Sequence, residues 1–165
     1  FMANYPEVSE VTLKSIEKLN NADIPCNILT KGILPIELSN LSKKNEYGIT
    51  LVSLDENYRI KTEPNASPYQ DRIDALKKLH DAGCKTWVSI EPYPTPNIIE
   101  QNIFEILNAI SFVDKIIFGR THYNKMISEY KNHKQFYNNE AKKVISFCQD
   151  NNIAYHIKTG TLTNE

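Results

Sequence analysis

Short apolar runs alternate along this chain with longer segments in which apolar residues recur every three or four positions. The short runs are mostly aliphatic or β-branched and are bounded by polar residues or glycine, a pattern typical of buried strands. We predict strands over five segments: 24–30, 47–53, 86–90, 114–119 and 153–157. The periodic segments predict amphipathic helices, because one face is apolar and the other charged. These helices cover 8–19, 34–42, 68–82, 97–110 and 141–148.

Local end signals define two of these helices. Ser67 precedes Pro68, and Gln70 completes the spacing of a capping box, so we expect Ser67 to cap a helix that begins at Pro68. Gly83 stands where a left-handed residue ends such a helix. Asn97 is expected to cap the following helix. The polar segment 55–64 is predicted to be a loop.

A helix precedes each predicted strand, five times over, and this order is typical of an α/β protein with parallel strands. Two architectures fit the pattern: an open doubly wound sheet and part of a barrel. About five strands are too few for a complete eight-fold barrel, which typically needs about 250 residues. In both architectures, ligands bind at the carboxyl ends of the strands.

Polar side chains end four predicted strands: Lys31, Ser53, Glu91 and Arg120. Lys31 has the charge to hold a carboxylate or phosphate, or else to reach solvent or pair with Glu91. The Ser53 hydroxyl suits a sugar hydroxyl, although an ordinary loop serine is the alternative. For Glu91 the general-acid, ligand-binding and salt-bridge roles all remain open.

Arg59 and Glu63 lie in the predicted loop after the second strand. A pair of opposite charges there would order the loop over the strand ends. The alternative is a solvated surface pair that contributes little to stability.

Composition excludes several classes of function. Nineteen basic and twenty acidic residues give a net charge of −1, so charge does not indicate a nucleic-acid partner. The apolar runs are far shorter than a membrane-spanning helix. The three cysteines do not fit a disulfide framework, so we expect reduced thiols in a cytoplasmic protein. The glycines are scattered, which disfavours a phosphate-binding loop. The three cysteines Cys26, Cys84 and Cys148 and the four histidines fit no metal-ligand spacing, so no metal ligand is assigned.

Several motifs follow one another in an order that carries a family resemblance. They are Ile28-Leu29-Thr30-Lys31-Gly32, Val52-Ser53-Leu54-Asp55-Glu56 with Arg59, Glu63-Pro64, and Ser67-Pro68 with Arg72. Together they resemble the radical S-adenosylmethionine (SAM) superfamily, and more narrowly its spore photoproduct lyase-like branch. The resemblance covers roughly residues 1–120.

The resemblance implies a TIM-like partial (β/α)6 barrel with parallel strands inside and helices outside. It implies that Lys31 contacts the methionine carboxylate of SAM, that Ser53 contacts the ribose, and that Glu91 lines the same pocket. In this superfamily a Cys-x-x-x-Cys-x-x-Cys loop holds a [4Fe-4S] cluster, and cleavage of SAM yields a radical that abstracts hydrogen from a substrate. The substrate of this chain is unknown.

This sequence contains no such cysteine loop. We therefore interpret 1–165 as a single domain, the C-terminal part of a radical SAM enzyme, which is inactive when isolated. Two other functions remain open. One is an aldolase-type lyase in which Lys31 or Lys158 forms a Schiff base. The other is an interaction module in which the segment from Tyr123 to Tyr137 binds a partner.

Overall fold

The structure is a computed structural model that describes residues 5–121 and 125–163. His122, one of the four histidines, and Tyr123, the first residue of the segment predicted to bind a partner, lie outside the described residues. Within the described ranges, no helix is long and apolar enough to cross a bilayer.

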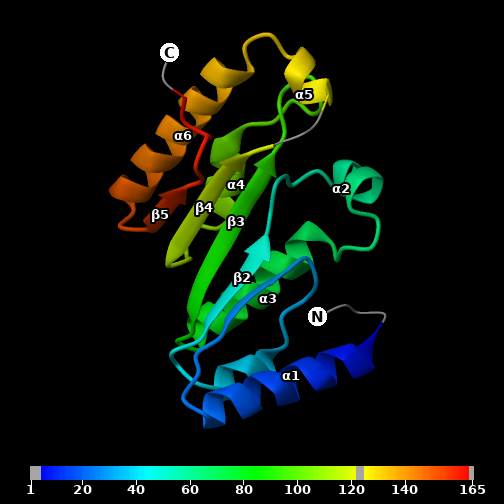
Figure 1. Ribbon diagram of the computed structural model, residues 1–165, viewed down its shortest axis with the longest axis vertical. Helices are drawn as coiled ribbons and strands as arrows, with labels where there is room; N and C mark the ends of the chain where they lie inside the picture. Colours follow the sequence, from blue (N-terminus) through cyan, green and yellow to red (C-terminus); the bar gives the residue numbers. More distant parts are fainter. Residues whose placement is uncertain (1–4, 122–124, 164–165) are drawn as a thin grey trace.

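Five parallel strands form one sheet, and each strand pairs with its neighbours in sequence (Figure 1). The strands are β1 (Asn27–Thr30), β2 (Glu46–Thr50), β3 (Lys85–Tyr93), β4 (Lys115–Arg120) and β5 (Ala154–Ile157). All five predicted strands are confirmed, with ends that shift by a few residues.

Helices connect the strands in the predicted alternation. They are α1 (Pro6–Asn21), the 3-10 helix η1 (Ile36–Asn40), α2 (Glu56–Thr62), α3 (Tyr69–Asp81), α4 (Ile103–Ala109), α5 (Lys125–Glu129) and α6 (His133–Asp150). Helix α2 lies near the carboxyl ends of the strands, and α1 lies at the opposite end of the molecule (Figure 1).

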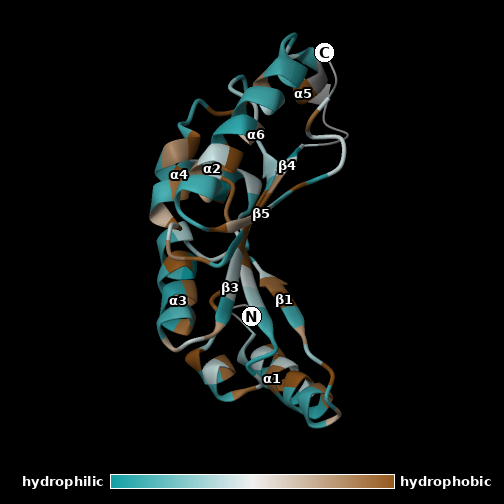
Figure 2. Cartoon of the chain, turned by 90° about the vertical axis from the view of Figure 1, so that its left-hand side faces the viewer, coloured by the Kyte–Doolittle hydropathy of each residue, from teal (hydrophilic) through white to brown (hydrophobic). Residues whose placement is uncertain are grey.

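The hydrophobic core lies between the sheet and the helices on one of its faces. Figure 2 shows α3 and α4 on one side of the strands, and α6 packs against β4 and β5. Alternate strand residues such as Ile49, Val88, Ile90 and Phe118 point toward these helices and are fully buried. Burial of such side chains contributes about 1.5–3 kcal/mol each to stability.

The sequential order of strands decides between the two predicted architectures. A doubly wound sheet reverses its strand order near the middle and carries helices on both faces. Here the order runs β1-β2-β3-β4-β5 without reversal. The chain is therefore an α/β protein whose sheet is consistent with part of a (β/α) barrel, as predicted.

Three local predictions are wrong. The segment 55–64 is not a loop, because Asp55 accepts two backbone N–H bonds and thereby caps α2. Ser67 does not cap α3, since its N-cap is Pro68 and no side chain of that residue accepts a bond there. Helix α4 begins only after Asn102, which caps it by accepting the Phe104 N–H. Gly83 has the predicted left-handed φ, +76°.

Candidate functional site

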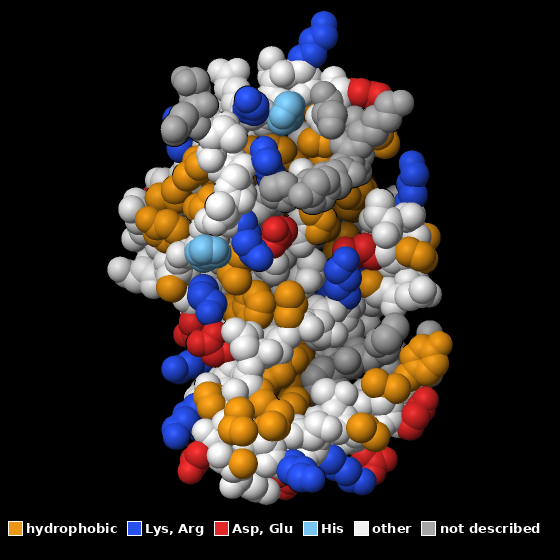
Figure 3. Space-filling view, viewed as in Figure 1, with side chains coloured by type: hydrophobic (Ala, Val, Ile, Leu, Met, Phe, Trp, Pro, Cys, Tyr) orange, Lys and Arg blue, Asp and Glu red, His pale blue; other side chains and the backbone are white. Residues whose placement is uncertain are grey.

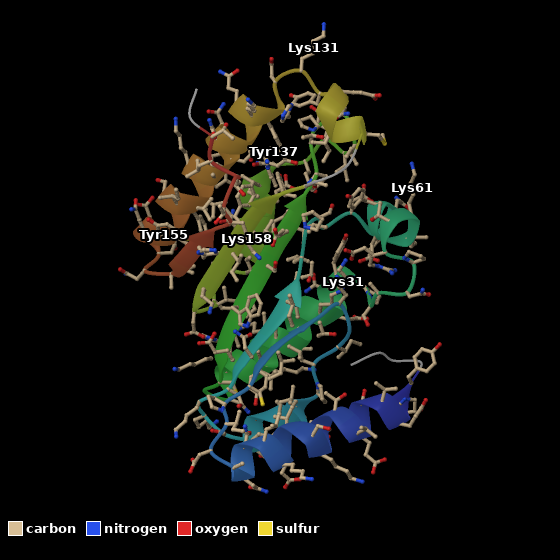
Figure 4. All side chains as sticks on the ribbon, in the orientation of Figure 1. Lys31, Lys61, Lys131, Tyr137, Tyr155 and Lys158 are labelled. Carbon is tan, nitrogen blue, oxygen red and sulfur yellow. The ribbon has the colours of Figure 1, made fainter. Side chains whose placement is uncertain are left out.

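The carboxyl ends of the strands meet at one edge of the sheet, which we call the carboxyl edge. Lys31 directly follows β1, Ser53 follows β2, Glu91 lies in the last part of β3, and Lys158 directly follows β5. Figure 4 shows Lys31 and Lys158 on the face of the sheet that is turned away from α3 and α4.

We call that face the open face and define it by strand register. It carries, among others, Gly48, Trp87, Ser89, Lys115 and Gly119, which alternate with the core residues along each strand. Figure 3 shows basic and acidic side chains among apolar ones on this side. A parallel sheet is normally covered on both faces, whereas α3 and α4 lie on the other side of these strands (Figure 2), and the side chains of Trp87 and Ser89 on the open face are themselves buried.

Lys31 is held by a carboxylate from the segment after α2. Its Nζ lies 2.8 Å from Glu63 Oε1, and the lysine side chain is still 47% exposed to solvent. The second oxygen of Glu63 lies 3.1 Å from Nη2 of Arg72, a side chain that is fully buried in α3. Two cations therefore share one carboxylate at the end of β1.

Arg72 also ties together three parts of the chain. Its Nε–H donates to the Ser67 carbonyl at 2.7 Å, and its Nη1–H donates to the Thr50 carbonyl at 2.9 Å. The guanidinium lies 4.9 Å from the centre of the Tyr69 ring. Burial, and then the nearby Glu63 carboxylate, raise the pKa of the Tyr69 phenol above its usual range. The end of β2 is thus fixed to α3 and to Glu63.

Arg59 and Glu63 do not pair with each other, so the predicted ion pair is wrong. Arg59 bonds Glu56 within α2 and donates to the Ala66 carbonyl at 2.7 Å. Glu63 instead pairs with Lys31 and Arg72. Glu63 therefore links the segment after α2 to the end of β1 and to α3, whereas the ion pair of Arg59 stays within α2. Their loop-ordering role remains a prediction.

Two cavities lie at the carboxyl edge. One, of about 500 Å³, lies between the end of β1 with Lys31 and Gly32 and the segment 62–66. The other, of about 600 Å³, is lined by Ser53, Asp55 and the residues before α4. The structure thus brings Lys31 and Ser53 to the same edge but places them in different cavities, and Glu91 lines neither of these two.

The Ser53 hydroxyl is buried and already has a backbone partner. The Asp55 N–H donates to Ser53 Oγ at 3.1 Å. Since a hydroxyl both accepts and donates, its proton remains available for a further acceptor.

Glu91 pairs with Lys158 rather than with Lys31. Its Oε2 lies 3.2 Å from Lys158 Nζ. The alternative Lys31–Glu91 pair does not form, because Lys31 forms its ion pair with Glu63 instead. Arg120 follows Gly119 and so lies on the helix-covered face, where its backbone N–H donates to the Thr161 hydroxyl.

The structure bears on the two other functions. Schiff-base formation needs an uncharged amine, whereas Lys31 and Lys158 both lie in ion pairs with carboxylates. In the segment from Tyr123 to Tyr137, the Tyr137 hydroxyl donates to the Tyr93 carbonyl at 2.7 Å and the ring is buried. Tyr137 is therefore a core residue rather than a contact surface.

No group of three or more metal-ligating side chains occurs within the described residues. Cys26, Cys84 and Cys148 are free and lie on three different parts of the fold: the segment before β1, the segment before β3, and α6. The described residues therefore do not fit a [4Fe-4S] cluster, which takes thiolates from several cysteines at one place.

The cysteines should differ in reactivity. Burial raises the pKa of the Cys148 thiol to about 11 and also raises that of Cys84, so little reactive thiolate forms at pH 8. We expect iodoacetamide at pH 8 to alkylate the half-buried Cys26 first and to spare Cys148 in the folded protein. Peptide mass spectrometry after brief labelling measures this order, and early labelling of Cys148 would contradict the packing of α6.

Sequence reasoning assigned no role to Gly119, which lies beside Glu91. A Cβ added at Gly119 would lie 2.8 Å from Glu91 Cδ. A glycine within an apolar strand indicates close approach of another group, and that signal was present in the sequence.

This chain is similar to some known proteins over part of its sequence and to others in its fold. No family model matches the chain. An uncharacterized protein of Acidianus two-tailed virus is 29% identical over 109 residues, which cover 64% of this chain and 36% of that protein. An uncharacterized protein of Methanocaldococcus jannaschii is 35% identical over 91 residues, which cover 53% of this chain and 33% of that protein.

Two crystal structures of SuiB from Streptococcus suis share the architecture. The complex with SAM has a TM-score of 0.63 and 13% identity, over 85% of this chain and 33% of SuiB. The other SuiB structure has a TM-score of 0.56 and 14% identity, over 88% and 35%. These likenesses show the fold. The chain spans about a third of the length of each of these proteins.

Proposed function

We propose that this chain is the C-terminal part of a radical SAM enzyme and that it binds SAM at the carboxyl edge of its sheet. Its likeness in fold to SuiB bound to SAM supports the proposal. So does the order of motifs around Lys31, Ser53 and Arg72, which favours the spore photoproduct lyase-like branch.

The unequal charge at the end of β1 is the observation that carries the proposal. Lys31 and Arg72 bring two positive charges to one carboxylate, Glu63. The group thus has an excess of one positive charge, and the half-exposed Lys31 ammonium is the part that a ligand can reach. An ammonium is a suitable point charge for a carboxylate. Lys31 would therefore bind the methionine carboxylate of SAM.

The other two predicted residues would bind uncharged or cationic parts of SAM. The Ser53 hydroxyl would donate its free proton to a ribose oxygen, and the Glu91 carboxylate would accept from a donor group of the same ligand. SAM would then extend along the carboxyl edge, from the end of β1 past β2 to β3.

The radical chemistry belongs to the whole enzyme. The described residues do not fit the iron–sulfur cluster, so the proposal assigns its cysteine ligands to a part of the enzyme other than this chain. A bound cluster would supply the electron for cleavage of SAM. The chain's own residues would bind and orient SAM, and the substrate is not assigned.

Replacement of Lys31 by alanine tests the proposal in the full-length protein. We expect the affinity for SAM to fall about ten- to hundredfold, since a hydrogen bond to a charged group contributes about 1.5–3 kcal/mol. Glu63 keeps Arg72 as a partner, so the fold should persist. Equilibrium dialysis with labelled SAM measures the affinity.

Lys61 provides a matched control, because it is an exposed lysine on α2 near the same edge (Figure 4). Lys61→Ala should bind SAM like the unmodified protein. Equal affinity of Lys31→Ala and Lys61→Ala would refute the role of Lys31.

A further inference from the structure

Glu91 reaches across the neighbouring strand. Beyond Ile90 the register of β3 against β4 shifts, and Glu91 lies within this irregular part. Its carboxyl group lies directly over Gly119 of β4, where a Cβ would come within 2.8 Å of both Cδ and Oε1 of Glu91. Real Cβ atoms do not approach other atoms so closely, so only glycine leaves this position open to the carboxylate.

Lys158 meets the same carboxylate from the far side of β4. Its Nζ lies 3.2 Å from Glu91 Oε2. Its backbone N–H donates to the Phe118 carbonyl at 2.9 Å, so hydrogen bonding to β4 fixes the start of this side chain beside Gly119. The Glu91–Lys158 pair therefore spans β4 from β3 to the end of β5.

The pair is not closed to further partners. The Glu91 side chain is 26% exposed to solvent, and the Lys158 side chain is 45% exposed. Both lie at the carboxyl edge on the open face, which is where barrel enzymes bind their ligands. A carboxylate accepts several hydrogen bonds, so Glu91 has room for a donor group of a ligand in addition to Lys158.

We propose that Gly119 and Lys158 are positioning residues that hold the Glu91 carboxylate over β4, where it accepts a hydrogen bond from an ammonium or hydroxyl group of SAM. This inference rests on the proposed function for the identity of the ligand. Gly119 provides the space, and Lys158 fixes the direction of the carboxylate.

A second ion pair on the open face serves as a matched control. Lys115 Nζ lies 2.7 Å from Glu46 Oε2, with exposure similar to that of the Glu91 pair. It lies at the opposite, amino-terminal end of the strands. If position at the carboxyl edge matters, changes to the Glu91–Lys158 pair should lower the affinity for SAM, and changes to the Glu46–Lys115 pair should not.

Equilibrium dialysis of labelled SAM against variants of the full-length protein tests the inference. Gly119→Ala and Lys158→Met should each weaken SAM binding about tenfold. Lys158→Arg should retain most of the affinity of the unmodified protein, because it keeps the positive charge. Glu91→Gln combined with Lys158→Met should bind no more weakly than Glu91→Gln alone, since both changes act on one contact. Lys115→Met should bind normally.

The outcomes separate this inference from the proposed function. If the unmodified protein does not bind SAM, the proposed function fails. If it binds SAM while Lys158→Met binds equally well, or while the losses from Glu91→Gln and Lys158→Met add, the positioning role fails. A crystal structure of Gly119→Ala gives a readout without ligand: a displaced Glu91 carboxylate supports the inference, and an unmoved one overturns it.

Discussion

Replacement of Arg72 by methionine is expected to lower the free energy of unfolding by about 3–5 kcal/mol, which is typical for loss of one partner from a buried ion pair. Methionine fills much of the same space but cannot donate a hydrogen bond. The carbonyl groups of Ser67 and Thr50 would lose their donor, and Glu63 would keep only Lys31. Urea denaturation followed by circular dichroism measures the change.

Lys77 is the control for this experiment. It lies on the same helix and forms an exposed ion pair with Asp81. Exposed pairs contribute little, so Lys77→Met should change stability by no more than about 0.5 kcal/mol. If Arg72→Met were as mild as Lys77→Met, the buried guanidinium would not support the carboxyl edge, contrary to our description.

Replacement of Gly48 by alanine is expected to cost about 1–3 kcal/mol, the usual range for overpacking. Gly48 lies opposite Trp87 in the register of β2 and β3. An added Cβ would lie 2.4 Å from Trp87 Cε2, so the indole ring must move. Trp87 is the single tryptophan of the chain, and its fluorescence emission should shift to longer wavelength as the ring becomes exposed.

A double variant isolates the steric clash between a Cβ at position 48 and the Trp87 ring. In a Trp87→Ala background the partner ring is gone, so the additional effect of Gly48→Ala should be small. Denaturation monitored by circular dichroism compares the two backgrounds. Equal costs in both would show that the ring does not limit the space at Gly48.

The strands could be predicted from sequence because each is a short apolar run with polar ends. Ile116 and Phe118, for example, alternate with the open-face residues Ile117 and Gly119 of β4 and are fully buried against the helices. Their order could not be predicted in the same way. Pairing of strands is a long-range property, and only the sheet topology distinguishes part of a barrel from a doubly wound sheet.

Helix ends and charge pairs were less predictable, because tertiary contacts decide them. The N–H of Tyr69, in the first turn of α3, is bonded by Glu56 from another helix at 2.6 Å, which replaces the cap expected from Ser67. Glu63 and Glu91 have lysine partners 32 and 67 residues away in sequence, and no local spacing signals such pairs. The sequence therefore located the candidate residues at strand ends, but their ion-pair partners could be identified only from the folded structure.

The intact mass and iron content of the native polypeptide test the central claim most directly. We would isolate the protein from its source cells under anaerobic conditions and measure both quantities on the same sample. A radical SAM enzyme predicts a mass well above the 19.0 kDa of this chain and about four irons per polypeptide. A 19.0 kDa polypeptide without iron would contradict the proposed function.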